Sequence, residues 1–227
     1  MLRLLYSITL ILMLLCRGHW YRNIAMQGKP VFVPIVFLYK KKVHKSFTEK
    51  FTAAVVELVL GEGLSAGVSI GPMISSNAVN DVHTLVEDYI AAGAKLVLGG
   101  KRDIMGDTFY QPTILTDVTN DMPIAKNEIF GPVSPIIVFD DEEQVIGMAN
   151  DTEYGLAVYF YACDIGRIWR VAEGLEYGMV VINEGIISNA AAPFGGVKQS
   201  GNGREGSKYG LDDYLEIKYL CMGGLDK

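Results

Sequence analysis

One glycine-rich stretch decides how this sequence is interpreted: Ala192-Pro193-Phe194-Gly195-Gly196-Val197-Lys198-Gln199-Ser200-Gly201-Asn202-Gly203-Arg204-Glu205-Gly206-Ser207-Lys208-Tyr209-Gly210. Glycine loses more backbone freedom on folding than any other residue, so a dense run persists where the backbone turns sharply or approaches a ligand closely. Here the glycines are interleaved with charged and aromatic side chains, unlike a flexible Gly/Ser linker. Residues 192–210, called the glycine loop below, are therefore predicted to form an ordered loop beside a functional site.

The glycine loop also contains Gly201-Asn202-Gly203-Arg204-Glu205-Gly206, which matches the G-x-G-x-x-G pattern of dinucleotide-binding proteins. That fingerprint requires an apolar strand before it, a helix that opens within it and an acidic residue about 20 positions later. The preceding residues 195–200 are not an apolar strand, and the acidic residues Asp212, Asp213 and Glu216 follow too early. We interpret this match as coincidental.

Three motifs in order resemble the aldehyde dehydrogenase superfamily. The first is Asn127-Glu128-Ile129-Phe130-Gly131-Pro132, the second is Asn150-Asp151-Thr152-Glu153-Tyr154-Gly155-Leu156-Ala157, and the third is the glycine loop from Pro193 to Glu205. Within the superfamily, residues 183–188 and 214–219 resemble the succinate-semialdehyde dehydrogenases. The similarity runs from about Phe47 to Gly224. It implies an α/β fold, namely the parallel-sheet catalytic domain of that family, and NAD(P)-dependent oxidation of succinate semialdehyde to succinate, as in 4-aminobutyrate degradation.

The resemblance also implies roles for four residues. Glu128 is expected to accept hydrogen bonds from a ribose of NAD or NADP, and Phe130 to pack against the nicotinamide ring. Ser188 is expected to bind the distal carboxylate of the substrate, and Phe194 to line the aldehyde tunnel. Without the resemblance, the sequence favours a solvated loop acid at Glu128 and a core residue at Phe130, and the motif match reverses this preference for a complete enzyme. Lys198, Arg204 and Glu205 are predicted to hold the glycine loop in place. Asn183 is predicted to end a strand and tie down a loop, although a role beside the site is open.

The family's catalytic groups have no counterpart in this chain. Family members attack the aldehyde with a cysteine in a G-Q-x-C segment, whereas this chain has Gln27-Gly28-Lys29-Pro30-Val31 and no cysteine between Cys16 and Cys163. The general-base glutamate, the arginines that bind the substrate carboxylate and the cofactor-binding domain are missing too. No catalytic residue is therefore assigned, and we expect the chain alone to be inactive and not to bind the cofactor.

Composition fits a globular protein with a true core and excludes several classes. The 227 residues are 50% hydrophobic and 20% charged. A net charge of −6 argues against nucleic acid as a partner, because phosphates require a basic surface. The three cysteines show neither metal-ligand spacing nor a disulfide framework, which suits a reducing compartment. Cys163 and Cys221 lie in apolar runs and are predicted to be buried, inert thiols.

Residues 1–45 differ from the remainder and are predicted to be an unrelated hydrophobic segment. Leu4 to Cys16 is nearly all apolar, as in the hydrophobic region of a signal peptide, but is too short to span a membrane. Two interpretations stay open: a signal anchor that tethers the chain to a membrane, and a substituted coding segment that displaced the genuine upstream sequence. By family, the protein is expected in the mitochondrion or the cytoplasm.

Residues 46–210 are predicted to form the partial catalytic domain from alternating helices and strands. Helices are expected over 47–60 and from a cap at Ser76 or Asn77, with a buried stripe ending at Ile90. Two more are expected after a cap at Asp140 or Asp141, and over 165–175 after a cap at Asp164. His83 lies off its stripe and is expected to be exposed. Buried strands are expected over 95–98 and 178–182, and a further strand is expected over 156–162. Prolines predict edge or irregular strands over 110–115 and 133–139.

Residues 211–227 are predicted to be an oligomerisation strand and tail. From Tyr214 to Cys221 the sequence alternates so that Leu215, Ile217 and Tyr219 share one apolar face. A strand with free N–H and C=O groups pairs readily with another chain. We therefore expect a homo-oligomer or association with full-length subunits. The second function that the sequence supports is accordingly a non-catalytic assembly partner of the complete enzyme.

Overall fold

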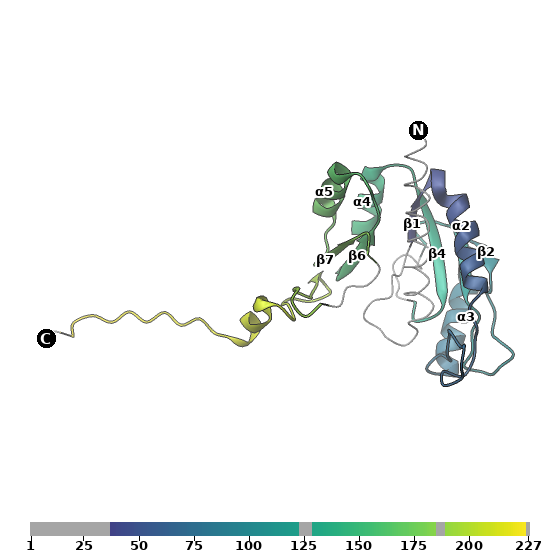
Figure 1. Ribbon diagram of the computed structural model, residues 1–227, viewed down its shortest axis with the longest axis horizontal. Helices are drawn as coiled ribbons and strands as arrows, with labels where there is room; N and C mark the ends of the chain where they lie inside the picture. Colours follow the sequence, from purple (N-terminus) through teal and green to yellow (C-terminus); the bar gives the residue numbers. More distant parts are fainter. Residues whose placement is uncertain (1–36, 123–128, 185–188, 226–227) are drawn as a thin grey trace.

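The protein, seen as a computed structural model, is described over residues 37–122, 129–184 and 189–225. Its larger sheet has four strands in the order β1-β4-β3-β2. These are β1 (Phe37–Lys40), β2 (Lys95–Leu98), β3 (Thr113–Val118) and β4 (Val133–Phe139). Strands β1, β4 and β3 are parallel, whereas β2 pairs antiparallel with β3, so the sheet is mixed (Figure 1).

Two helices, α2 (Lys41–Val56) and α3 (Ser76–Ala91), pack against this sheet. Neighbouring residues of β4 enter different apolar clusters: Ile136 lies in the cluster of α2, and Ile137 lies in the cluster of α3. Because successive side chains of a strand point to opposite faces, one helix covers each face of the sheet. This layered arrangement confirms the predicted α/β class.

Helix α3 differs slightly from its prediction. Its N-cap is Ser75, whose hydroxyl accepts a hydrogen bond from the Ala78 amide at 3.2 Å. The buried stripe ends at Tyr89, which is 2% exposed, whereas Ile90 is 40% exposed. Position 89 follows Val86 by three residues, so the larger Tyr89 ring continues the same stripe and Ile90 turns toward solvent.

The strand prediction was wrong about the burial of β2 and was confirmed in part for β4. Strand β2 was expected to be buried, but it is the edge strand and is largely exposed. Strand β4 contains Pro135 and was expected to lie at an edge or to pair irregularly, and it lies inside the sheet, between β1 and β3. The predicted irregularity is present, because the pairing of β3 with β4 shifts register between Leu115 and Val118, next to Pro135. Proline has no amide hydrogen to donate to a neighbouring strand, and a local register shift allows the pairing to continue past it.

The second part of the fold is a βαβ unit. Strand β6 (Ala157–Phe160) leads through α5 (Ile165–Gly174) to β7 (Met179–Ile182), and the two strands pair in parallel as predicted. Helix α4 (Glu142–Asn150) packs against α5. The predicted caps are confirmed: Asp141 accepts from the Gln144 amide at 2.8 Å, and Asp164 accepts from the Arg167 amide at 2.6 Å.

The glycine loop joins this unit through a short antiparallel pair, β5 (Tyr154–Gly155) with β8 (Val197–Lys198). A 3₁₀ helix, η3 (Lys208–Tyr214), follows. The chain then runs away from the body of the molecule (Figure 1), and residues 215–225 contain no strand. Over the described residues, no helix is both long and apolar enough to cross a membrane.

The structure differs from the sequence prediction at residue 45 and at two cysteines. Strand β1 pairs with β4, and α2 begins at Lys41, so a boundary at residue 45 falls inside a helix of the fold. Most residues before this point, 1–36, lie outside the described residues. Both cysteines that were predicted to be buried are exposed. Cys163 directly precedes Asp164, the cap of α5. Cys221 lies in the C-terminal segment 215–225, whose residues are all exposed.

Candidate functional site

The glycine loop is closed by a backbone bridge at its base. Phe194 donates its amide to the Glu205 carbonyl at 2.8 Å, and Glu205 donates to the Phe194 carbonyl at 2.7 Å. Below this bridge, the Ser207 amide donates to the Ala190 carbonyl at 2.9 Å. No helix opens within residues 201–206, which confirms that the G-x-G-x-x-G match is coincidental. The predicted ordered loop is thus present, with Phe194 at its base.

Arg204 holds the inside of the loop. One guanidinium nitrogen, Nη1, donates to the carbonyl oxygens of Gly196 at 2.8 Å and Gly203 at 2.6 Å. The Arg204 amide donates to the Asp213 carboxylate at 3.0 Å, which ties the loop to η3. Gly203 has φ 85° there, and a Cβ at this position would collide with the Asp213 carboxylate. The predicted role of Arg204 as a structural residue is confirmed.

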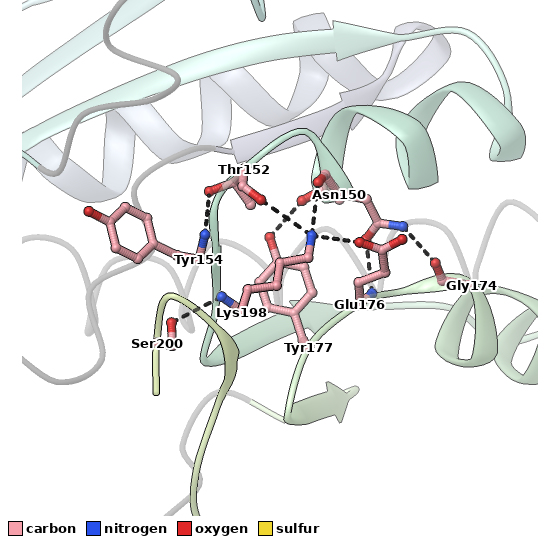
Figure 2. A network of polar contacts seen from close by, with 10 residues as sticks. Asn150, Thr152, Tyr154, Gly174, Glu176, Tyr177, Lys198 and Ser200 are labelled. Carbon is pink, nitrogen blue, oxygen red and sulfur yellow. Dashed lines mark hydrogen bonds and ion pairs between the residues drawn. The ribbon is translucent and has the colours of Figure 1, made fainter. Parts of the chain in front are cut away.

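Lys198 connects the glycine loop to the C-terminal ends of helices α4 and α5. Its Nζ donates to the carbonyl oxygens of Asn150 at 3.1 Å and Thr152 at 3.3 Å, and lies 2.6 Å from the Glu176 carboxylate (Figure 2). Ser200 adds a hydroxyl acceptor for the Gly155 amide at 3.0 Å. The ion pair predicted for Lys198 is therefore present, and its partners come from two other segments.

Asn150 and Tyr177 complete this network, and sequence reasoning did not single out their roles. Asn150 donates Nδ2 to the Gly174 carbonyl at 2.7 Å and accepts the Glu176 amide on Oδ1 at 2.9 Å. Tyr177 donates its hydroxyl to the Ala149 carbonyl at 2.6 Å (Figure 2). Burial, and secondarily Glu176, raises the pKa of Tyr177, so its hydroxyl remains a donor. The sequence signal for Asn150 was its position at the start of the second motif.

Backbone segments meet closely where β7 begins. A Cβ on Gly178 would collide with the Gly195 carbonyl, and a Cβ on Gly155 would lie 2.8 Å from the Glu176 carbonyl. The Gly178 amide donates to the Gly155 carbonyl at 2.9 Å. These two positions require glycine because three stretches of backbone pass within contact distance.

Asn183 ends β7 in the left-handed region, with φ 58°. Its Nδ2 donates to the Ala162 carbonyl at 2.8 Å, and its Oδ1 accepts from the Ala162 amide at 2.9 Å. Asparagine tolerates this backbone conformation better than most residues. The prediction that Asn183 ties down a loop is confirmed, and this anchor lies directly before residues 185–188.

The cofactor motif is described from Ile129 onward, so Glu128 lies outside the described residues. Ile129 is buried, whereas Phe130 is 64% exposed, which contradicts the alternative of a core residue. Gly131 passes so close to α3 that a Cβ would lie 2.6 Å from Val82. This turn therefore buries one side chain and presents the next, the Phe130 ring, to solvent, where it is available to pack against a planar ligand.

Of the two expected substrate residues, Ser188 lies outside the described residues and Phe194 is half-buried. Phe130 and Phe194 belong to separate segments, the turn before β4 and the base of the glycine loop. Within residues 37–122, 129–184 and 189–225, no group of His, Cys, Asp and Glu could hold a metal ion.

His83 was expected to be exposed but is half-buried against the β2–β3 connection. Its Nδ1 lies 3.3 Å from the Tyr110 hydroxyl, and its Nε2 lies 3.5 Å from the Glu87 carboxylate. Burial, followed by the charge of Glu87, raises the pKa of Tyr110 to about 12, so this hydroxyl stays protonated and can donate to His83. The contact joins α3 to the segment before β3 and is structural.

The matching family model is described as the aldehyde dehydrogenase family and spans residues 23–220. The chain is 57% identical to a glutarate-semialdehyde dehydrogenase of Pseudomonas aeruginosa over 81% of this chain and 38% of the relative. It is 52% identical to the mitochondrial succinate-semialdehyde dehydrogenase of Arabidopsis thaliana, covering 84% and 36%. It is 55% identical to an NADP-dependent succinate-semialdehyde dehydrogenase of Escherichia coli, covering 80% and 38%.

Solved structures of aldehyde dehydrogenases are similar to this chain as well. A succinate-semialdehyde dehydrogenase from Burkholderia pseudomallei superposes with a TM-score of 0.87 at 50% identity, covering 93% of this chain and 44% of that one. A betaine aldehyde dehydrogenase from Staphylococcus aureus in complex with NAD+ superposes with a TM-score of 0.84 at 34% identity, covering 90% and 43%. This chain thus spans well under half the length of the relatives it matches. On the family model and these identities, the chain belongs to the aldehyde dehydrogenase family.

Proposed function

We propose that this chain supplies the glycine loop and the nicotinamide-facing turn of an NAD(P)-dependent succinate-semialdehyde dehydrogenase. In this reaction succinate semialdehyde, water and NAD(P)+ give succinate, NAD(P)H and protons. The observation that carries the proposal is the 57%, 52% and 55% identity to relatives named for the oxidation of semialdehydes that end in a carboxylate. By the same argument, the protein acts in 4-aminobutyrate degradation and resides in the mitochondrion or the cytoplasm.

We propose NAD or NADP as the cofactor, because one similar enzyme is named for NADP+ and one similar solved structure is a complex with NAD+. When bound, the nicotinamide accepts the hydride of the aldehyde. The exposed ring of Phe130 fits contact with a planar group, and burial of Ile129 beside it fixes the turn. Glu128 would accept hydrogen bonds from ribose hydroxyls, which suit a carboxylate because it offers two acceptor oxygens.

On the substrate side, Phe194 would line the path of the aldehyde and Ser188 would bind the distal carboxylate. A neutral hydroxyl binds a carboxylate more weakly than a cation does, since charge-assisted hydrogen bonds are roughly twice as strong. Ser188 therefore needs cationic partners, which the family resemblance assigns to arginines that have no counterpart in this chain. We expect Phe194→Ala to raise KM for the aldehyde in the complete enzyme.

The test is an assay of residues 1–227 beside a native enzyme of full length whose C-terminal part matches residues 47–224. The purified chain alone should show no oxidation of succinate semialdehyde with NAD+ or NADP+, because Gln27-Gly28-Lys29-Pro30-Val31 offers no thiol. The native enzyme should prefer succinate semialdehyde to acetaldehyde in kcat/KM. Turnover by the chain that disappears on alkylation of Cys163 or Cys221 would reveal a different nucleophile and contradict the proposal.

A second candidate function, a non-catalytic assembly partner, is favoured by the C-terminal segment. Leu215 is 65% exposed, Ile217 is 100% exposed and Tyr219 is 86% exposed. Exposed apolar side chains on a segment outside any sheet favour pairing with another chain. Ile217→Lys should abolish self-association or binding to full-length subunits while the βαβ unit stays folded. A wild-type chain that sediments as a monomer at micromolar concentration, alone and with the full-length enzyme, would contradict this function.

A further inference from the structure

Lys198 joins three parts of the chain that are distant in sequence. Its ammonium contacts the carbonyl oxygens of Asn150, the last residue of α4, and of Thr152, two residues later, and the carboxylate of Glu176, just after α5. Lys198 itself lies in β8 of the glycine loop. A single cation therefore contacts two carbonyl oxygens and one carboxylate, which lie at or just beyond the C-terminal ends of α4 and α5 (Figure 2).

The backbone at Lys198 is unfavourable for lysine. Its φ is 56°, in the left-handed region that residues with a Cβ seldom occupy. Strain of this kind persists only where surrounding contacts hold the residue in place. At Lys198 the contacts made by its own ammonium are the ones that bind this position to α4 and α5.

Apolar packing contributes little to the loop. Across residues 192–210, all of them described, Gly196 is the one buried residue. A segment with few buried apolar contacts opens locally at a lower free energy than the core. The order of the glycine loop therefore depends on polar contacts, namely its backbone hydrogen bonds and the side-chain contacts of Lys198, Ser200 and Arg204.

We propose that Lys198 is a positioning residue for aldehyde binding. Its ammonium fixes the glycine loop on α4 and α5 and thereby fixes Phe194, four residues earlier, at the place where the aldehyde passes. The role of Phe194 rests on the proposed function, whereas the coupling between Lys198 and Phe194 is a property of this chain by itself. The two are therefore tested separately.

Arg204 is the competing anchor. Because it binds the carbonyl oxygens of Gly196 and Gly203, it is able in principle to hold the Phe194–Glu205 bridge without Lys198. The proposal requires that loss of the Lys198 ammonium loosens this bridge as well as the adjacent pairing, in which the Gln199 amide donates to the Glu153 carbonyl at 2.9 Å.

Hydrogen exchange of residues 1–227 measures this directly and needs neither aldehyde nor cofactor. In Lys198→Met, the amides of Phe194 and Glu205 should exchange about tenfold faster or more, as expected for the loss of charge-assisted hydrogen bonds. The Thr113 amide, bonded to the Pro132 carbonyl at 2.8 Å, reports on the large sheet and should not change. Lys101→Met, at an exposed lysine of another loop, is the matched control and should leave all these amides unchanged.

Chemical rescue separates positioning from general loss of stability. Added propylammonium should restore slow exchange of Phe194 in Lys198→Ala, because it returns an N–H donor to the carbonyl oxygens. Tetramethylammonium carries no donor and should not restore it. Should Lys198→Met unfold the large sheet, Glu176→Gln provides a milder loss of the ion pair and should speed the same loop amides by a smaller factor.

Two results would overturn the proposal. In the first, Gln199 exchanges faster while Phe194 and Glu205 stay protected, which would make Arg204 the anchor. In the second, both ammonium ions restore protection equally, which would mean that the rescue is an effect of ionic strength.

In the complete enzyme, the matching expectation is that Lys198→Met raises KM for succinate semialdehyde more than it lowers kcat. Failure of that assay for the wild-type enzyme would refute the proposed function and leave the exchange result intact.

Discussion

The large sheet and the glycine loop are ordered by different forces. In the sheet, Ile114 and Ile136 are both 0% exposed and pack between strands and helix α2. In the loop, order comes from hydrogen bonds of Arg204, an ion pair of Lys198 and close backbone contacts. Burial of apolar surface is non-directional, whereas polar contacts depend on distance and angle.

This difference means that the stability of the fold and the position of the glycine loop depend on different contacts. A sheet that is packed on both faces by helices resists opening, while a loop held by polar groups can be placed accurately without a core of its own. Functional segments often lie on such loops, positioned by a rigid scaffold. The expected aldehyde-lining residue, Phe194, lies on the loop, and the bulk of the buried apolar residues lie in the scaffold.

The largest effect is expected from a cavity in the sheet. Ile136→Ala should lower the free energy of unfolding by about 2–5 kcal/mol, because it removes buried methyl groups that neighbours cannot replace. Urea unfolding followed by circular dichroism measures this. Ile104→Ala is the matched control, since Ile104 is 102% exposed, and it should change stability by less than about 0.5 kcal/mol. Equal losses for the two variants would contradict the assignment of the core.

A smaller loss is expected where backbone segments meet at the loop. Gly178→Ala places a methyl group against the Gly195 carbonyl, which cannot move away as a side chain would. We expect a loss of about 1–3 kcal/mol and faster exchange of loop amides than of sheet amides. Gly63→Ala is the control, because nothing lies within 4 Å of its added Cβ. A stable Gly178→Ala variant with an unchanged loop would show that the backbone there is not close-packed.

Much of this architecture was predictable because it depends on short-range patterns. The caps Asp141 and Asp164 and the stripe of α3 follow from residues only a few positions apart. The edge position of β2 and the central position of β4 were not predictable in this way. They depend on which strands pair, and that choice is made by contacts across the whole sheet. Pro135 is tolerated in the centre because a register shift lies beside it.

The site was predictable in its residues and less so in their partners. Lys198 and Arg204 could be identified as loop anchors because charged residues among glycines need partners. Asn150 lies 48 positions from Lys198, and no local pattern signals their contact. The burial of the thiols was mispredicted for a related reason: Cys221 lies in an apolar run, but that run extends away from the core.

An intermediate effect is expected at the anchor after β7. Asn183→Ala removes both contacts to Ala162 and leaves a non-glycine residue in the left-handed region, so the loss should be about 2 kcal/mol. Asn183→Gly keeps the backbone conformation and loses only the side-chain contacts, so it should lose about half as much. Thermal unfolding of the two variants separates the contributions. A larger loss for glycine than for alanine would mean that backbone strain at position 183 is unimportant.

The smallest effect is expected from the ion pairs between α4 and α5, and it depends on pH. Glu142 lies 2.8 Å from Arg170 and 3.0 Å from Arg167, and the hydrogen bonds from Arg170 and then Arg167 lower the pKa of its carboxyl below the usual 4.5.

A carboxyl group whose pKa is lowered by folding stabilises the folded state above its unfolded pKa, and this contribution is lost as pH falls through the folded pKa. The difference in stability between wild type and Glu142→Gln should therefore be constant near neutral pH and shrink as pH falls below about 4.5. Because these side chains are exposed, added salt should reduce the difference as well. Glu143→Gln, in the same first turn of α4, serves as the control and should show a weaker pH dependence. A difference that persists unchanged at acidic pH would mean that Glu142 acts through packing, and the α4–α5 contact would then belong with the apolar scaffold instead of the polar network that holds the loop.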